Sequence, residues 1–174
     1  MRYLSRKTTI RMSRKETIIA TFLLIIFGTS MHFVHHLPCF NHFWGYIFPV
    51  IESVMAHMKM IFYPMLLLSL YLVISRREIK EFGAPVLGSL AVMPMVIAAF
   101  FAYWIFVRHE IMALDIVIYI AAMVGAILFA KRWSSCRFIR EKWPLWIIVA
   151  VAVILATGYL TYHAPDWIIF ADLG

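Results

Sequence analysis

Four polar side chains stand together at the head of a long apolar run, and all four are of types that perform chemistry in proteins. They are Glu52, Ser53, His57 and Lys59, and the apolar run that they open continues to Ser75. Each of these groups is costly in hydrocarbon, so their presence in an apolar segment indicates a site. Imidazole with carboxylate suits Zn²⁺ and related metals, and histidine also serves general acid–base catalysis because it titrates near neutral pH.

Helical spacing narrows which of these groups can act together. Ser53 and His57 are four residues apart, so on a helix they share one face and can hydrogen-bond or converge on one ligand. Glu52 and Lys59 lie seven apart, on one stripe of the same helix, and are predicted to form an ion pair. The sequence contains no HExxH or CxxC motif, so the prediction of a metal site rests on the placement of residues.

The amino-acid composition indicates that these groups are positioned by a membrane-embedded fold. Of the 174 residues, 64% are hydrophobic and 14% are charged. Soluble domains average about 45–50% apolar and about 25% charged, so a soluble fold is a poor interpretation. The chain has room for about five membrane spans and no separate soluble domain, and we predict one all-α membrane domain over residues 1–174.

Five apolar runs are long enough to cross a bilayer, which takes about 20 residues. They cover approximately residues 17–36, 49–75, 84–107, 111–130 and 144–162. Residues 1–16 form a basic tail, and residues 38–50 are expected to be a bent or partly re-entrant approach to the second span. Pro64 is predicted to kink that span because proline cannot donate the helical hydrogen bond. Small residues at four-residue spacing in the fourth span favour close helix packing.

The distribution of basic residues predicts the orientation. With the N-terminus inside the cell, fourteen of the sixteen Lys and Arg residues face the cytoplasm, and only Lys59 and Arg108 lie on the outer side. This bias is typical of multi-pass proteins of the cell membrane with an N-in, C-out topology. The net charge of +7 is thereby explained by topology and lipid contact, so no nucleic-acid partner is expected. Cys39 and Cys136 fall on opposite sides and cannot form a disulfide within the chain.

This topology gathers the histidines on one side of the membrane. All seven are predicted at the outer side, namely His32, His35, His36, His42, His57, His109 and His163. The leading hypothesis is a polar site that opens to the outer face and binds a metal or a lipid head group. Its predicted metal ligands are His32, His57, Asp115 and His163, with zinc as the representative divalent ion.

If the site is catalytic, the chemistry expected is hydrolysis of a lipid head group at the outer leaflet. Glu52, Ser53, His57 and Lys59 are the candidate catalytic residues. A metal-bound water or His57 would act as the base, and Lys59 would stabilise the developing negative charge.

Two other functions remain open, and so does a purely structural role for the histidines. Imidazoles at a membrane interface also serve as amphipathic packing groups, much as Trp and Tyr do. The chain is then a structural or accessory subunit in which the polar groups fix helix packing or receive a partner in a homo- or hetero-oligomer. A small transporter is the third possibility, but five spans without internal symmetry would require oligomerisation.

The opening stretch resembles a family of small bacterial multi-pass membrane proteins of unknown function, with a signature close to FxPVNESxWEHxKxxFxPML. The matching residues, with Phe48 directly before them, are Pro49, Val50, Glu52, Ser53, His57, Lys59, Phe62, Pro64, Met65 and Leu66. The pair His32–Phe33 and the ending with Phe170 and Asp172 are also similar. Ile51 stands where the family has Asn, and Ala56 where it has Glu. The resemblance implies a focus on the central motif and brings no established activity.

Overall fold

Helices make up every regular element in the part of the chain that the computed structural model describes, which is residues 12–34, 43–50, 53–109 and 111–166. The α-helices are α1 (Arg14–Phe33), α2 (Val54–Arg76), α3 (Gly83–Val107), α4 (Met112–Trp133), α5 (Arg137–Glu141) and α6 (Trp143–Tyr162). Two short 3₁₀ helices are η2 (Trp44–Tyr46) and η3 (Ile79–Glu81). Helices α1, α2, α3, α4 and α6 contain segments long and apolar enough to cross a membrane, so the predicted all-α bundle with five spans is confirmed.

Helix α1 begins at Arg14, earlier than the predicted start near Thr17, because a capping box closes its first turn. The Ser13 hydroxyl accepts a hydrogen bond from the Glu16 N–H at 3.1 Å, and the Glu16 carboxylate accepts one from the Ser13 N–H at 2.7 Å. Together these bonds satisfy two N–H groups that lack partners within the helix. The Ser-x-x-Glu pattern of residues 13–16 therefore predicts the start of α1 from the sequence.

Helix α2 begins at Val54, later than the predicted start near Pro49. The carbonyl of Ser53 accepts a hydrogen bond from the His57 N–H at 3.1 Å, which closes the first turn. Pro64 lies inside α2 and cannot donate to the carbonyl of Met60. That carbonyl packs instead against Gly28 of α1, where a Cβ would lie only 2.6 Å from it.

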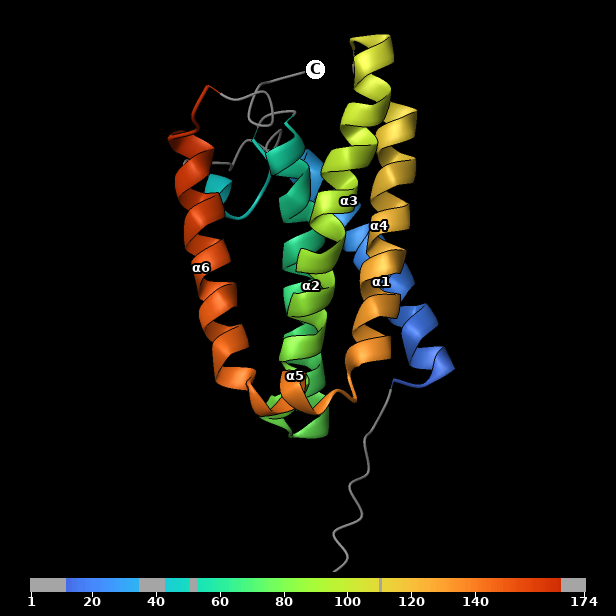
Figure 1. Cartoon of the computed structure of the whole chain (residues 1–174), viewed down its shortest axis with the longest axis vertical. Helices are drawn as coiled ribbons and strands as arrows, with labels where there is room; N and C mark the ends of the chain where they lie inside the picture. Colours follow the sequence, from blue (N-terminus) through green and yellow to red (C-terminus); the bar gives the residue numbers. More distant parts are fainter. Residues whose placement is uncertain (1–11, 35–42, 51–52, 110, 167–174) are drawn as a thin grey trace, which may run out of the picture.

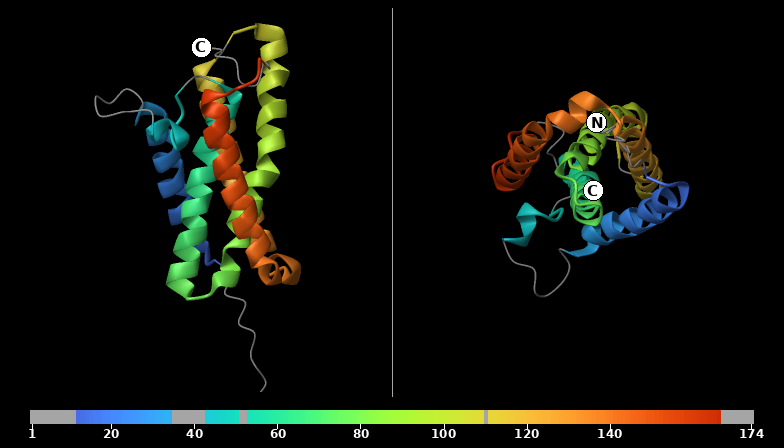
Figure 2. Two further views of the ribbon diagram at one scale, coloured as in Figure 1. Left: turned by 90° about the vertical axis from the view of Figure 1, so that its left-hand side faces the viewer. Right: turned by 90° about the horizontal axis from the view of Figure 1, so that it is seen from below.

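Helix α2 is the central helix of the bundle. Within its membrane-spanning segment 61% of the residues are buried, compared with 17–22% in the other four spans. The views in Figures 1 and 2 agree with this, because α2 runs through the middle with α1, α4 and α6 around it. The outward faces of α1, α3, α4 and α6 expose large apolar side chains, as expected of surfaces that contact lipid.

Helices α3 and α4 form a closely packed antiparallel hairpin (Figure 1). Ala126 and Ala130 on α4 are buried, and a Cβ on Gly88 of α3 would lie 2.5 Å from the Ala126 carbonyl oxygen. The predicted close contact through small residues is therefore confirmed. Arg108 ends α3 in the left-handed conformation, with φ of 60°, and this reverses the chain toward α4.

The two ends of the bundle differ in chemistry. The end that holds the first turn of α2, here called the His57 end, also holds the other described histidines, His32, His109 and His163. The opposite end, here called the Arg76 end, contains η3, α5 and the start of α6 (Figure 1). This segregation agrees with the predicted alternation of the spans. Which end faces the cell exterior stays a prediction.

A cluster of ion pairs closes the Arg76 end. Glu81 is only 4% exposed and accepts hydrogen bonds from Arg76, at 3.2 Å, and from Arg140 of α5. Arg76 also lies 3.9 Å from Glu16 of α1, and Arg140 lies 3.9 Å from Glu78. The sequence suggests only a topological role for these arginines, whereas they tie α1, α2, η3 and α5 together.

Candidate functional site

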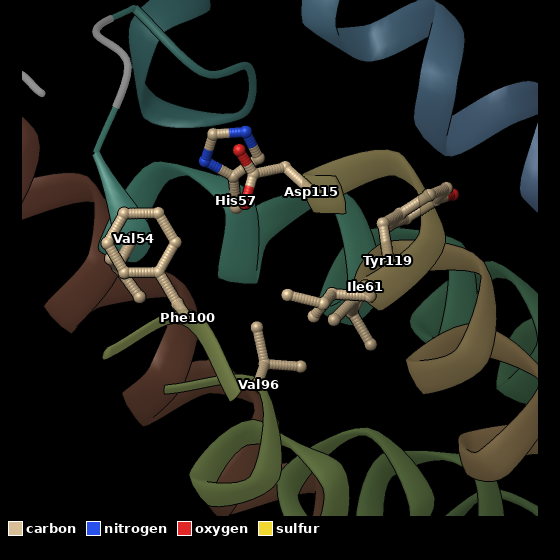
Figure 3. Close-up of a pocket in the computed structure, with 8 residues that line it drawn as sticks. Val54, His57, Ile61, Val96, Phe100, Asp115 and Tyr119 are labelled. Atoms are coloured by element: carbon tan, nitrogen blue, oxygen red, sulfur yellow. The ribbon is translucent and has the colours of Figure 1, made fainter. Parts of the chain in front are cut away.

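A small cavity lies between α2, α3 and α4 at the His57 end of the bundle (Figure 3). Its polar lining comes from His57 and Asp115, and its other walls are Val54, Ile61, Val96, Phe100, Ile118 and Tyr119. The space open to the centre of a water molecule is about 20 Å³. That volume admits about one water molecule, or an ion of similar size.

Asp115 lies in the first turn of α4, and its two carboxylate oxygens have different surroundings. Oδ1 accepts a hydrogen bond from the hydroxyl of Tyr103 on α3 at 2.6 Å. Oδ2 is buried and has no hydrogen-bond partner among the described residues. An unsatisfied buried polar group costs about 1–3 kcal/mol, and more when it is charged. The arrangement therefore suits a cation or a proton donor at Oδ2.

His57 shares this cavity, and one of its ring nitrogens is held by the backbone. Nδ1 lies 2.8 Å from the carbonyl oxygen of Ser53. A carbonyl oxygen can only accept, so this bond requires Nδ1 to bear a proton, and in the neutral ring Nε2 then holds the lone pair. The predicted interaction of Ser53 with His57 thus runs through the backbone carbonyl. Histidines that bind metals commonly donate their second nitrogen to a carbonyl in this way.

His32, in the last turn of α1, lies beside His57. The two ring centroids are 5.7 Å apart, and the ring planes are tilted by 33°. Two imidazoles on one tetrahedral zinc have centroids about 5 Å apart, from a Zn–N distance of about 2.1 Å. The two imidazoles are thus close to each other, although His32 is not among the described residues that line the cavity.

His163 lies away from the cavity. It is exposed at the end of α6, stacks on Tyr159 with 4.5 Å between ring centroids, and its Nδ1 is 3.2 Å from the Tyr159 carbonyl oxygen. Within the described ranges, no three His, Cys, Asp or Glu side chains form a group that could hold a metal ion. The structure thus brings His32, His57 and Asp115 to one region without His163, and metal binding stays a prediction.

Lys59 faces the opposite side of α2, toward η2 and α6. Its ammonium group donates to the carbonyl oxygen of Gly45 at 2.7 Å, the hydroxyl of Thr161 at 2.6 Å and the carbonyl oxygen of Phe48 at 3.4 Å. These bonds match its three N–H groups, and the residue is only 2% exposed. Its predicted ion pair involves Glu52, which lies outside the described residues. A catalytic role for either residue stays a prediction.

Tyr103 is a residue of this region that sequence reasoning missed. In an antiparallel helix hairpin, residues at equal distances from the turn lie opposite each other. Tyr103 and Asp115 are each six residues from His109, at the centre of the turn between α3 and α4. That symmetry, together with the tendency of a buried carboxylate to find a donor, is a signal that the sequence contained.

A family model matches residues 5–173, which is nearly the whole chain. The chain belongs to the DUF6512 family. This family is described as one of unknown function. Membership therefore agrees with the predicted resemblance to a family of unknown function. The match of the specific motif around residues 48–66 stays a prediction. Neither a curated protein nor a solved structure matches this member of the family.

Proposed function

We propose that this DUF6512 protein is a multi-pass protein of the cell membrane that binds one divalent metal ion near the outer face. The ligands in this proposal are Nε2 of His57 and Oδ2 of Asp115, with His32 as the third. His57 and Asp115 line one cavity (Figure 3), and the buried Oδ2 of Asp115 has no partner among the described residues. This orphaned carboxylate oxygen is the observation that carries the proposal.

The surroundings of the two ligands support the same proposal. Each has its second polar atom tied to the protein: Nδ1 of His57 to a backbone carbonyl, and Oδ1 of Asp115 to the hydroxyl of Tyr103. Such outer-shell bonds orient metal ligands and fix the histidine tautomer. A nitrogen and a carboxylate oxygen together suit zinc and its neighbours in the first transition series.

The size of the cavity favours an ion over a lipid head group. Room for about one water molecule is sufficient for a metal ion and its bound water, but far too small for a phosphorylated head group. Metal binding is therefore proposed ahead of head-group hydrolysis. The outer location rests on the bias of basic residues toward the Arg76 end of the bundle.

A structural or accessory subunit is the alternative, and one observation favours it. Lys59, a central residue of the 48–66 stretch, directs its donors to η2 and α6 and none to the cavity. Part of this polar stretch therefore serves helix packing. In that case His57 and Asp115 would also serve packing, and their variants would change stability alone.

Metal analysis of purified full-length protein distinguishes these functions. The protein is loaded with Zn²⁺ in detergent, desalted and measured for bound metal together with three variants: His57→Ala, Asp115→Asn and His163→Ala. We expect one equivalent in the wild type and in His163→Ala, whose histidine is exposed outside the cavity, and loss of the metal in the other two. Metal-free wild-type protein, or equal loss in His163→Ala, would overturn the proposal.

A further inference from the structure

Helix α2 is the central helix, yet one stripe along its Arg76 half is exposed. The side chains of this stripe are large and apolar or aromatic and are 44% to 75% exposed, namely Leu67, Leu70, Tyr71 and Ile74. Their spacing of i, i+3, i+4 and i+7 places them on one face of the helix. Leu68 and Leu72, on the opposite face, are buried. We call this face the α2 stripe.

The short helix η2 covers the other half of the same face. The Lys59 ammonium group donates to the carbonyl oxygen of Gly45 at 2.7 Å, and the Tyr63 hydroxyl donates to the carbonyl oxygen of Tyr46 at 2.9 Å. At 100° per residue, Lys59 and Tyr63 lie on the same side of α2 as the stripe. Figure 2 shows η2 on this side, between α1 and α6. The stripe thus begins one helical turn beyond the part of α2 that η2 covers.

The length of the α2 stripe matches one leaflet of a bilayer. Leu67 and Arg76 are nine residues apart on α2, which corresponds to about 14 Å. The hydrocarbon core of a bilayer is about 30 Å thick, so one leaflet contributes about 15 Å. A partner helix that crossed the whole membrane along this face would meet η2 in the other half. The acyl chains of a lipid in one leaflet fit the stripe without reaching η2.

Exposed basic side chains surround the Arg76 end of this stripe. Arg77 directly follows α2, Lys80 belongs to η3, and Lys142 precedes the first residue of α6. All three are exposed, and among the described residues none has an ion-pair partner. The acidic side chains at this end pair with other arginines, namely Glu16, Glu78, Glu81 and Glu141. The three positive charges therefore complement an anionic head group.

We propose that the α2 stripe and these three basic residues bind an anionic phospholipid of the leaflet at the Arg76 end. Its acyl chains lie along Leu67, Leu70 and Ile74, and its phosphate accepts hydrogen bonds from the guanidinium and ammonium groups. This proposal shares with the proposed function only the location in a membrane. It involves neither His57 nor Asp115 and is therefore independent of the metal site.

Native mass spectrometry of the purified full-length protein measures the binding. The protein is titrated with phosphatidylglycerol or with phosphatidylcholine that has the same chains, and we expect one phosphatidylglycerol to bind more tightly. Each basic residue near an anionic lipid contributes about fivefold, so Arg77→Gln/Lys80→Gln should weaken this binding about 10- to 30-fold. Arg132→Gln/Arg137→Gln is the matched control, because it removes the same charge from exposed residues of α4 and α5. This control should bind phosphatidylglycerol as the wild type does.

A second pair of variants tests the acyl-chain contact. Leu70→Ala removes part of the stripe and should weaken phosphatidylglycerol binding about two- to fivefold, since several dispersion contacts are lost. Leu128→Ala is its control, because Leu128 lies on α4 and is 54% exposed, compared with 44% for Leu70. All of these variants change exposed side chains, so their melting temperatures without added lipid should match that of the wild type.

The other possible outcomes overturn the proposal. Equal affinity of the wild type for the two lipids does so, and so does an equal loss in the two charge variants. Displacement of the lipid by an equal concentration of soluble glycerol phosphate would show that the phosphate binds without the chains. A lipid-free dimer that is lost in Leu70→Ala and kept in Leu128→Ala would assign the stripe to a second copy of the chain. Since no metal is added, none of these results decides the proposed metal site.

Discussion

The hydroxyl of Tyr119 lies directly over the Cα of Gly28, in the space that a side chain at position 28 would occupy. From there it donates to the carbonyl oxygen of Ile25 at 3.2 Å. The carbonyl oxygen of Met60, which receives no helical hydrogen bond because residue 64 is proline, approaches the same glycine. Gly28 is therefore the point where α1, α2 and α4 meet, and its hydrogen atom is what allows the three helices to approach closely.

Substitution of Gly28 by Val should lower the free energy of unfolding by about 1–3 kcal/mol, the usual cost of forcing extra carbon into a packed interior. The Cβ would overlap the Tyr119 hydroxyl and the Met60 carbonyl, and both neighbours are held in place. Thermal or denaturant unfolding in detergent measures the change. Gly125→Ala is the matched control, because among the described residues a Cβ there would meet only Val92, at 3.6 Å. That variant should be neutral or gain up to about 1 kcal/mol of helix propensity. A similar loss in both variants would contradict this explanation.

The number and type of the spans could be predicted from the sequence because hydrocarbon thickness sets a simple length rule. The ends of the spans were harder to predict. The capping box of Ser13 and Glu16 could have been read in advance, whereas the late start of α2 depends on how Ser53 closes its first turn. A rule based on the length of apolar runs does not detect short amphipathic helices such as α5, whose five residues cannot cross a membrane.

The candidate site was predictable in part. Alternating spans place His32, His57 and Asp115 at one end of the bundle, and the structure brings them to one region. The direction of each side chain depends on helix rotation, which apolar runs do not encode because they are hydrophobic all round. The partners of Lys59 could not be foreseen for this reason, since Thr161 lies 102 residues away.

Loss of the buried charge at Glu81 should destabilise the protein strongly. Glu81→Gln leaves Arg76 and Arg140 without their shared carboxylate, and breaking a buried ion pair costs about 3–5 kcal/mol. Unfolding in detergent at constant salt is the measurement. The comparison is Arg137→Gln, which removes a pair with Glu141 from an 81% exposed side chain and should cost less than about 1 kcal/mol. The expectation fails if the two variants lose similar amounts.

The Lys59–Thr161 contact should be energetically coupled. In a double-mutant cycle of Lys59→Met and Thr161→Val, we expect an interaction energy of about 1–3 kcal/mol, since the bond joins a charged donor to a hydroxyl in a buried setting. Stability of the single and double variants supplies the cycle. Ser30→Ala is the control partner for Lys59→Met, because the exposed Ser30 hydroxyl donates to Ile26 in its own helix. Strict additivity for both pairs would argue against a Lys59 bridge.

The predicted orientation has a direct chemical test. Cys136 lies between α4 and α5 at the Arg76 end, and Cys39 lies outside the described residues. With the Arg76 end in the cytoplasm, a membrane-impermeant thiol reagent added to intact cells should label Cys39 and leave Cys136 unmodified. Single-cysteine variants, compared before and after permeabilisation, give the measurement. Labelling of Cys136 from outside would reverse the whole arrangement.

The hydrogen bond from Lys59 to Thr161 also implies an order in which parts of the bundle assemble during synthesis. Lys59 leaves the ribosome with α2, whereas Thr161 belongs to α6 and follows it by 102 residues. Until α6 has been inserted, this ammonium group lacks one of its acceptors in a setting where an unpaired charge is costly. The hydrogen bonds of Lys59 to η2 and α6 can therefore be completed only after α6 has been synthesised.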